Sequence, residues 1–428
     1  MANVHYVRGA MIEQLEPPAA SSGAAGWVRQ NLFSSPLNAI LSVLSLALVY
    51  SVIAALIPWL ISPTWQASSL SECREILEGA SGACWGVIRE RWLQLLFGFY
   101  PSELYWRVVL DFLLLIVAVA PVLFTGLPRK MLIFSALYPF LMPWLLWGGT
   151  VWGPVVAALG FGLGYLAHKL AKAALGGLAA MILAVLVPVI WWLFLAGPVS
   201  EAVASVLPLA LEPVESRNFG GFMLSITIGV VAIAISLPIG IVLALGRQSN
   251  LFIVRSLSVG FIEFIRGVPL ITLLFVASTL LNIFMPPGTD FDIILRVIIM
   301  VTLFASAYMA EVVRGGLAAL PKGQYEAADA LGLDFWLAQR LIIMPQALKI
   351  SIPGIVSTFI GVFKDTTLVS IIGLLDPIGL SNSIRADQSW NGIVWELYGF
   401  IALMFFIFCF SMSRYSMFLE RKLRTGHR

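Results

Sequence analysis

Charged residues are scarce in this sequence. Only 11% of its 428 residues are charged, whereas 60% are hydrophobic. A soluble protein of this composition would lack the polar faces needed to cover so many apolar helices, so a soluble globular fold is excluded. The net charge of +3 does not indicate a nucleic-acid partner, because the basic residues lie beside long apolar runs.

Motifs of intrinsic catalysis are also missing. The sequence contains no GxxxxGK(S/T) phosphate loop, no HExxH and no GxSxG. Its three histidines, His5, His168 and His427, are too scattered to form a metal site. The sequence therefore predicts a protein that is not an enzyme and that has neither a metal nor a cofactor of its own.

Cysteine is rare, with three residues in the whole chain. Cys409 lies in the last apolar run and is interpreted as a small packing residue. Cys73 and Cys84 share one predicted external loop, so they form either a disulfide or two free thiols. Both alternatives are open at this point.

Long apolar runs are abundant. About 20 apolar residues are needed to cross about 30 Å of hydrocarbon, and many runs reach that length. The sequence therefore predicts an all-α polytopic membrane protein with about ten transmembrane helices. The spans are expected near residues 37–61, 108–127, 131–147, 151–167, 178–196, 221–245, 257–284, 293–317, 347–374 and 394–414. The first run is too long and too late to be a cleavable secretory signal.

The order of spans and loops predicts two halves of five spans each. The expected parts are a cytosolic tail at 1–35, an N-terminal five-span extension at 36–217 with a periplasmic loop at 62–107, a core at 218–421 with a cytosolic loop at 320–346, and a cytosolic tail at 422–428. Basic residues gather in the loops of one side, which the positive-inside rule places in the cytosol. Both termini are expected on that side, and residues 197–219 are expected to form a second external loop.

The stretch 325–345, YEAADALGLDFWLAQRLIIMP, differs from the apolar runs on either side. Glu326 begins a segment of high helix propensity, and Gly332 is placed to end that helix in a left-handed conformation. Asp334 can cap a second, apolar helix that is expected to end near Pro345. Such a pair of helices either docks in a groove of a partner or lies on lipid headgroups.

Several motifs resemble the permeases of ABC importers, whose EAA loop is a coupling helix that fits a cleft of the cytosolic ATPase. The matching residues are Glu326-Ala327-Ala328 with Gly332 and Pro345, Gly220-Gly221-Phe222, and the stretches 263–270 (EFIRGVPL), 307–316 (AYMAEVVRGG) and 364–370 (KDTTLVS). The flanking motifs resemble the polar amino-acid branch (histidine, glutamate, glutamine, arginine and opine importers). The resemblance covers residues 218–421. The first half resembles, more weakly, the general L-amino-acid or glutamate/glutamine/aspartate/asparagine permeases.

The resemblance implies a five-helix core of the type I ABC importer in a bacterial inner membrane. It also implies a cytosolic ATPase dimer that binds ATP and Mg²⁺, a homologous second permease subunit that forms a heterodimer, and a periplasmic amino-acid-binding protein. Glu326, Ala327, Ala328, Gly332 and Pro345 would then couple the chain to the ATPase. Acidic and amide amino acids are the leading substrates.

Charges inside spans indicate functional sites, because they are costly in lipid. Glu263 and Arg266, and likewise Glu311 and Arg314, are three residues apart and can pair on one helix face. Gly267 and Pro269 interrupt the helix of the first pair, which makes it a candidate for the translocation path. The other candidates form one polar run: Lys364, Asp365, Thr366, Thr367 and Ser370.

Other polar and aromatic residues are interpreted as structural. Ser278 and Thr279 are weaker candidates, because hydroxyls in spans usually bond within the bundle. Trp144 and Trp147 are expected to belong to interfacial belts. Two rival functions stay open: a secondary transporter driven by an ion gradient, which would need symmetric discontinuous helices, and a membrane enzyme or scaffold.

Overall fold

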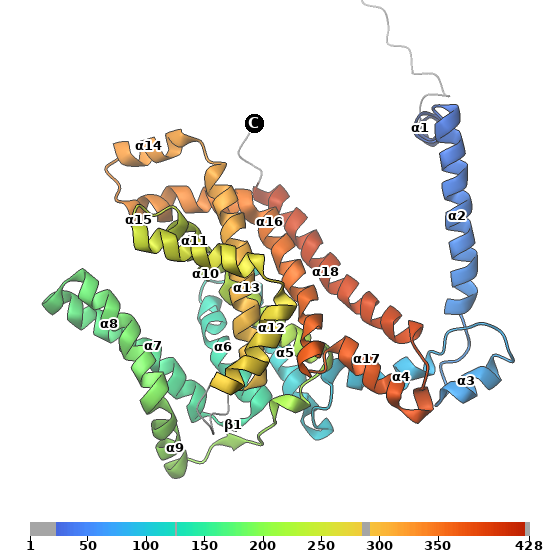
Figure 1. Cartoon of the computed structure of the whole chain (residues 1–428), viewed down its shortest axis with the longest axis horizontal. Coiled ribbons are helices and arrows are strands. Elements are labelled where there is room, and N and C mark those ends of the chain that lie inside the picture. Colours follow the sequence, from blue (N-terminus) through green and yellow to red (C-terminus); the bar gives the residue numbers. More distant parts are fainter. Residues whose placement is uncertain (1–22, 125, 285–291, 424–428) are drawn as a thin grey trace, which may run out of the picture. The chain divides into compact units, whose positions relative to one another are not determined.

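The structure is a computed structural model that describes residues 23–124, 126–284 and 292–423. These residues form helices joined by short connections, together with one two-stranded sheet (Figure 1). The chain divides into two compact units, Met1–Gly86 and Val87–Arg428. Most of the expected N-terminal tail and residues 424–428 lie outside the described residues.

The first unit contains α1 (Gly23–Asn31), α2 (Pro36–Leu60) and α3 (Leu70–Ile76). The Ser35 hydroxyl caps α2 by accepting a hydrogen bond from the N–H of Asn38 at 3.1 Å, and Pro36 fits the first turn, where no N–H is needed. None of the residues of α2, all of them described, is buried. Its 25 residues are long enough to span a membrane.

The residues that follow α2 fold around a disulfide. Cys73 in α3 and Cys84 are both buried and are joined, with their Cα atoms 5.8 Å apart. The Trp85 ring stacks on Trp65, and its indole N–H donates to the Leu60 carbonyl at 2.8 Å. Of the two alternatives for these cysteines, the structure has the bridge.

The second unit is a bundle with smaller helices attached. Its larger helices are α5 (Tyr105–Leu123), α6 (Met131–Trp147), α7 (Trp152–Leu175), α8 (Gly177–Ile190), α9 (Ala196–Val206), α10 (Gly221–Arg247), α11 (Phe252–Gly267), α12 (Leu270–Phe284), α13 (Ile293–Ala318), α16 (Met344–Asp365) and α18 (Trp395–Leu423). The smaller ones are α4 (Gly86–Phe97), α14 (Lys322–Ala330), α15 (Phe335–Ala338) and α17 (Pro377–Ala386). Two π segments are η2 (Trp191–Leu195) and η4 (Gln339–Ile343), and four 3₁₀ segments are η1 (Ser102–Leu104), η3 (Ser216–Asn218), η5 (Thr366–Ile372) and η6 (Gln388–Trp390). The strand β1 (Gly149–Thr150) pairs antiparallel with β2 (Ala210–Leu211).

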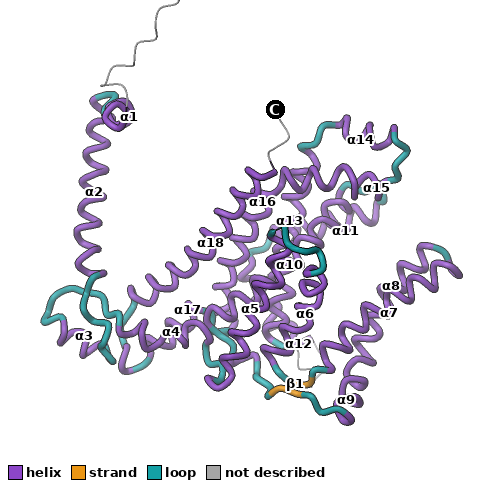
Figure 2. Tube along the Cα trace, turned by 180° about the vertical axis from the view of Figure 1, so that it is seen from behind, coloured by secondary structure: helices purple, strands orange, loops and turns teal. Residues whose placement is uncertain are grey.

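α10 and α13 form the centre of this bundle and pack closely along their length (Figure 2). Gly240 makes that contact possible, because a Cβ there would lie 2.7 Å from the Cβ of Met309. α14 and α15 follow the C-terminal end of α13, so that end is called the loop end, and the end where α10 and α13 begin is called the far end.

The helices α5 and α6 of the extension share the core of α10 and α13. Val108 and Tyr138 are buried in the same apolar cluster as Phe219, Met223 and Val297. Apolar packing therefore continues across the expected boundary between residues 217 and 218, which stays a prediction. The two compact units divide after Gly86.

α7 and α8 form a helical hairpin beside the bundle. The indole N–H groups of Trp191 and Trp192 donate to the carbonyls of Val156 and Ala157 at 2.8 and 3.0 Å. α7 continues past the expected end of its span at residue 167 as far as Leu175, so Lys169 and Lys172 lie in its last turns and not in a loop. α9 likewise occupies the first part of the expected external loop at 197–219.

The described residues contain eight helices long and apolar enough to span a membrane, one bent pair and the shorter apolar helix α6. The eight helices and the bent pair correspond to nine of the ten expected spans, and the 17-residue α6 lies at the tenth, 131–147. The all-α polytopic fold is confirmed. The interruption expected at Gly267 and Pro269 is present within the span 257–284, where α11 and α12 meet at 100°. Pro269 lacks an N–H and directly precedes α12, which explains the break.

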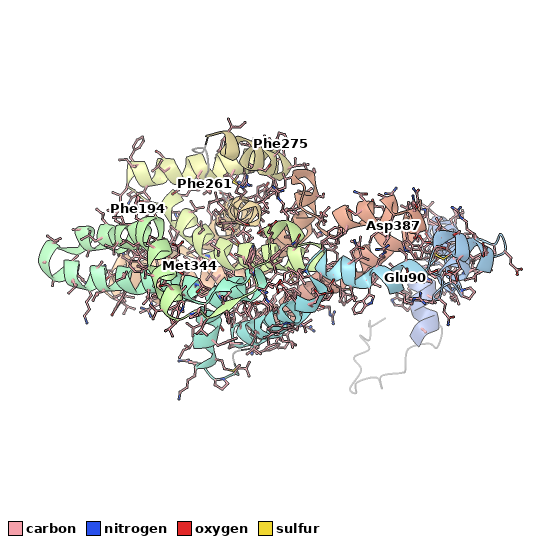
Figure 3. The ribbon with its side chains drawn as sticks, turned by 90° about the horizontal axis from the view of Figure 1, so that it is seen from below. Glu90, Phe194, Phe261, Phe275, Met344 and Asp387 are labelled. Carbon is pink, nitrogen blue, oxygen red and sulfur yellow. A yellow bond between two sulfur atoms is a disulfide. The ribbon has the colours of Figure 1, made fainter. Side chains whose placement is uncertain are left out.

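Two aspartates, Asp376 and Asp387, cap short helices at the far end, and their surroundings shift the pKa values of their carboxyl groups in opposite directions. Asp376 is fully buried and accepts hydrogen bonds from the N–H groups of Ile378 and Gly379 at 3.1 and 2.9 Å. Burial raises the pKa of its carboxyl from 3.8 to about 6. The N–H of Ser389 and the Arg91 guanidinium instead hold the pKa of Asp387 below its usual value. Figure 3 shows Asp387 beside Glu90, the neighbour of Arg91.

The raised pKa of Asp376 predicts a pH-dependent stability. A carboxyl whose folded pKa lies above its unfolded value stabilises the fold below pH 4 and loses that contribution as the pH rises through about 6. The full difference in pKa corresponds to about 3 kcal/mol in the free energy of unfolding.

Asp376→Asn keeps the cap and cannot ionise, so its melting temperature in detergent should exceed that of the wild type above pH 6 and should match it near pH 4. Asp387→Asn is the control of opposite sign, because its lowered pKa stabilises the fold at neutral pH. Identical melting curves for Asp376→Asn and the wild type at pH 8 would contradict the prediction.

Candidate functional site

Residues 320–346 form a pair of short helices at the loop end. α14 ends in a Schellman motif: the N–H of Gly332 donates to the Asp329 carbonyl at 2.9 Å, and the N–H of Leu333 donates to the Ala328 carbonyl at 3.2 Å. Gly332 has φ of +67°, a left-handed conformation that favours glycine. The turn is therefore determined by local sequence, as the spacing predicts.

The second helix begins at a side-chain cap and exposes large apolar residues. The Asp334 carboxylate accepts the N–H of Leu337 at 2.8 Å, as expected of an N-cap. Leu331 is 72% exposed and Trp336 is 71% exposed. Phe335 and Leu341 are also exposed. An apolar surface of this kind next to a polar helix is typical of an interaction site.

α14 presents one face outward and rests the other on the bundle. Glu326 and Ala327 are exposed, whereas Ala328 is buried. The Tyr325 hydroxyl donates to the Leu317 carbonyl at 3.4 Å, which ties α14 to the end of α13. The three residues of the EAA motif thus divide between the outer surface and the contact with the bundle.

The expected helix end at Pro345 is wrong. The helix that begins at Phe335 continues through η4 and α16, and Pro345 lies in the first turn of α16. Proline normally clashes with the carbonyl four residues earlier, and the wider turn of a π segment accommodates it. The side-chain amide of Gln346 also donates to the Ile342 carbonyl at 2.9 Å. Pro345 therefore marks a change of helix type.

A group of five charges, the Glu311 cluster, lies at the loop end where α10, α11 and α13 meet. It consists of Arg247, Glu263, Arg266, Glu311 and Arg314. The Glu311 carboxylate lies 2.7 Å from Arg247, 3.0 Å from Arg314 and 3.8 Å from Arg266. Its side chain is only 16% exposed. Glu311 therefore joins guanidinium groups from three helices.

The Glu311 cluster differs from the pairs expected from sequence spacing. Glu311 and Arg314 are paired as expected, but Glu263 bonds to Arg247 at 3.0 Å and Arg266 approaches Glu311. The expected pair of Glu263 with Arg266 is thus replaced by contacts between helices. Sequence reasoning missed Arg247, whose only signal is its position at the end of a span.

The other candidate path residues lie nearer the far end, in the last turns of α16 and in η5. The hydroxyls of Thr366, Thr367 and Ser370 donate to carbonyls three residues earlier, at 2.8, 2.9 and 3.0 Å. Lys364 is exposed and Asp365 is half-buried. The structure does not bring this run together with Glu263 and Arg266.

Comparison with known proteins identifies the family. A family model described as the inner membrane component of binding-protein-dependent transport systems matches residues 236–425. The glutamate/glutamine/aspartate/asparagine transport system permease protein BztC of Rhodobacter capsulatus is 58% identical over 435 residues, covering 100% of both chains. The inner membrane amino-acid ABC transporter permease protein YhdY of Escherichia coli K12 is 42% identical over 410 residues, 95% of each chain.

Shorter proteins match about half of this chain. The glutamate/aspartate import permease protein GltK of Escherichia coli O6:H1 is 28% identical over 208 residues, which cover 47% of this chain and 91% of GltK. A solved structure of an amino acid ABC transporter with histidines is 29% identical, with a TM-score of 0.42, and covers 46% of this chain and 90% of its own.

The fold and the full-length relatives define a multi-pass membrane permease. The chain belongs to the family of binding-protein-dependent transport system inner membrane components, and it is a permease subunit of an ABC importer. Permease subunits of this family are not themselves enzymes. The resemblance of the EAA motif and its flanks to this family is confirmed.

Removing the charge of Glu311 should loosen the loop end of the bundle. Glu311→Gln leaves three guanidinium groups with the single carboxylate of Glu263. We expect the free energy of unfolding to fall by about 2 kcal/mol, which is less than the loss on breaking a fully buried ion pair. Glu263→Gln is the matched control, because Glu263 is 55% exposed and its pair should contribute less than about 1 kcal/mol. The measurement is the melting temperature of each variant in detergent. Equal decreases in melting temperature for the two variants would contradict the larger contribution of Glu311.

Proposed function

We propose that this chain imports polar L-amino acids, with glutamate, glutamine, aspartate and asparagine as the leading substrates. The supporting observation is the 58% identity to BztC over the whole of both chains. The similarity to YhdY, also nearly full-length, supports amino acids as the class of substrate.

The energy for import reaches the chain through its loop end. The sequence has no phosphate-binding loop, so ATP and Mg²⁺ bind on a separate cytosolic ATPase dimer. The described residues contain no group of three or more His, Cys, Asp or Glu side chains that could hold a metal ion. The exposed apolar side chains of residues 331–341 supply the surface that fits a groove of the ATPase.

Five residues have distinct parts in this coupling. Glu326 and Ala327 contact the ATPase from the outer face of α14, while Ala328 seats the helix on the bundle. Gly332 sets the turn between α14 and α15. Pro345 marks the start of the regular helix α16, through which movement of the loop reaches the bundle.

The loop end lies in the cytosol, with both termini on the same side. A homologous second permease subunit completes the bundle as a heterodimer, because a transport path between two subunits needs a partner of similar fold. A periplasmic amino-acid-binding protein delivers substrate at the far end. The inner membrane location follows from the family.

The translocation path uses polar groups at two levels of the bundle. Glu263 and Arg266 stand at the loop end beside the bend between α11 and α12. The second level contains the charges and hydroxyls nearer the far end: Lys364, Asp365, Thr366, Thr367 and Ser370. Substrate would meet the residues 364–370 first and would leave past Glu263 and Arg266.

Reversing the charge of Glu326 should uncouple transport from ATP hydrolysis. Glu326→Arg places a cation on the docking face of α14, and we expect loss of uptake and of substrate-stimulated ATP hydrolysis with unchanged membrane insertion. Lys349→Glu, an exposed charge reversal on α16 outside the loop, is the control and should retain both activities. Unchanged stimulation of hydrolysis in Glu326→Arg would remove this role from the loop.

The turn at Gly332 gives a second test of coupling. Gly332→Ala has room for its methyl group but strains the left-handed backbone by about 1 kcal/mol. We expect substrate-stimulated ATP hydrolysis to fall about fivefold, the ratio that corresponds to this energy. Gly332→Asn should retain most activity, because asparagine tolerates this conformation. A Gly332→Asn variant as impaired as Gly332→Ala would show that conformation is not the cause.

A further inference from the structure

A pocket of about 750 Å³ lies at the far end of the bundle, away from the loop. Its walls come from the end of α6, the connection 214–217, α12, the start of α13, and η5. Phe275, labelled in Figure 3, belongs to the α12 wall. The volume lies in the range of about 300–1,000 Å³ that small-molecule sites occupy.

The wall formed by the connection is held in place by a chain of hydrogen bonds. The indole N–H of Trp147 donates to the Ser216 hydroxyl at 2.6 Å, and that hydroxyl donates to a carboxylate oxygen of Asp292. The other oxygen of Asp292 accepts the N–H of Leu295 at 2.9 Å and caps α13. Trp147 and Ser216 therefore join the end of α6 to the start of α13.

The same connection is also anchored to α5. The guanidinium of the buried Arg107 donates to the Glu212 carbonyl at 2.8 Å and to the Leu145 carbonyl at 2.7 Å. The N–H of Val214 donates to the Trp147 carbonyl at 2.9 Å. Both contacts fix the backbone that carries residues 215–217 at the pocket.

The pocket combines charges of both signs with a partly apolar lining. Arg217 and Arg296 supply two cations, and Glu215 and Asp292 supply two anions. Arg296 also donates to the Ser278 carbonyl at 3.0 Å, which joins α13 to α12. Both oxygens of Asp292 already accept hydrogen bonds, whereas the side chains of Glu215, the N-cap of η3, and Arg217, within η3, are exposed. A small molecule with one cationic and one anionic end fits this arrangement.

We propose that this pocket binds a free zwitterionic α-amino acid, with the Arg217 guanidinium taking its carboxylate and the Glu215 carboxylate taking its ammonium group. A guanidinium can bind a carboxylate through two parallel hydrogen bonds, which makes Arg217 the stronger of the two contacts. The inference rests on the proposed function, because it places the substrate class at one site on this chain.

Part of the pocket wall is formed by residues of the N-terminal extension. Trp147 and residues 214–217 lie outside the segment 236–425 that the family model matches. The N-terminal extension therefore contributes to recognition of the amino acid in addition to its packing in the bundle.

Protection of an introduced thiol tests the site. Thr279 lines the pocket with an exposed side chain, so Thr279→Cys in a Cys409→Ala background should react with a membrane-impermeant maleimide in the intact importer. Cys73 and Cys84 are joined and do not compete. We expect millimolar L-glutamate or L-glutamine, added without binding protein, to slow labelling at least threefold. Adding Arg217→Gln should abolish the protection, and Arg217→Lys should restore part of it.

The control thiol is Ser205→Cys in the same background, an exposed position on α9 outside the pocket, whose labelling should not change with the amino acid. Uptake of the same amino acids by the Cys409→Ala parent is measured in parallel. Three results, each with normal uptake, would overturn the proposed pocket and leave the proposed function standing. They are labelling of Thr279→Cys that the amino acid does not slow, equal protection when Arg217→Gln is added, and no labelling of Thr279→Cys by the external maleimide. Loss of both uptake and protection would overturn the proposed function as well.

Discussion

The attraction of one carboxylate for three guanidinium groups organises the loop end of this permease. Glu311 lies within 4 Å of Arg247, Arg266 and Arg314, which come from α10, α11 and α13. Unpaired charges are costly inside a membrane bundle, so this contact keeps the ends of three helices together. α13 leads directly into α14, and the position of the exposed loop therefore depends on the cluster.

Apolar packing holds the helices together over the rest of the bundle. Residues of α5 and α6 are buried in the same cluster as residues of α10 and α13, so the later part of the N-terminal extension belongs to the body of the permease. The helix α2 has the opposite character, because none of its residues is buried within its own unit. The N-terminal extension thus contains helices that are buried in the bundle and, in the first unit, a long apolar helix with no buried residue.

Features that depend on neighbouring residues were predictable from the sequence, whereas features that depend on distant ones were not. The apolar runs, the left-handed Gly332 and the Asp334 cap each follow from a few adjacent residues. The pairing of Glu263 could not be predicted, because Arg247 on another helix is a better-placed partner than Arg266. Gly267 and Pro269 mark the break between α11 and α12 in the sequence, whereas its angle of 100° and the passage of the helix through Pro345 depend on tertiary packing. The hydrogen bonds from Trp147 through Ser216 to Asp292 join residues far apart in the chain.

The helical run from Phe335 to Ile372 extends from the loop end toward the far end of the bundle. At about 1.5 Å per residue, its 38 residues extend over roughly 57 Å. Its first turn carries the exposed aromatic residues of α15, and its last turn forms part of the wall of the amino-acid pocket. Because one continuous run of backbone hydrogen bonds links α15 to η5, a displacement of α15 is passed directly to α16 and from there toward the far end.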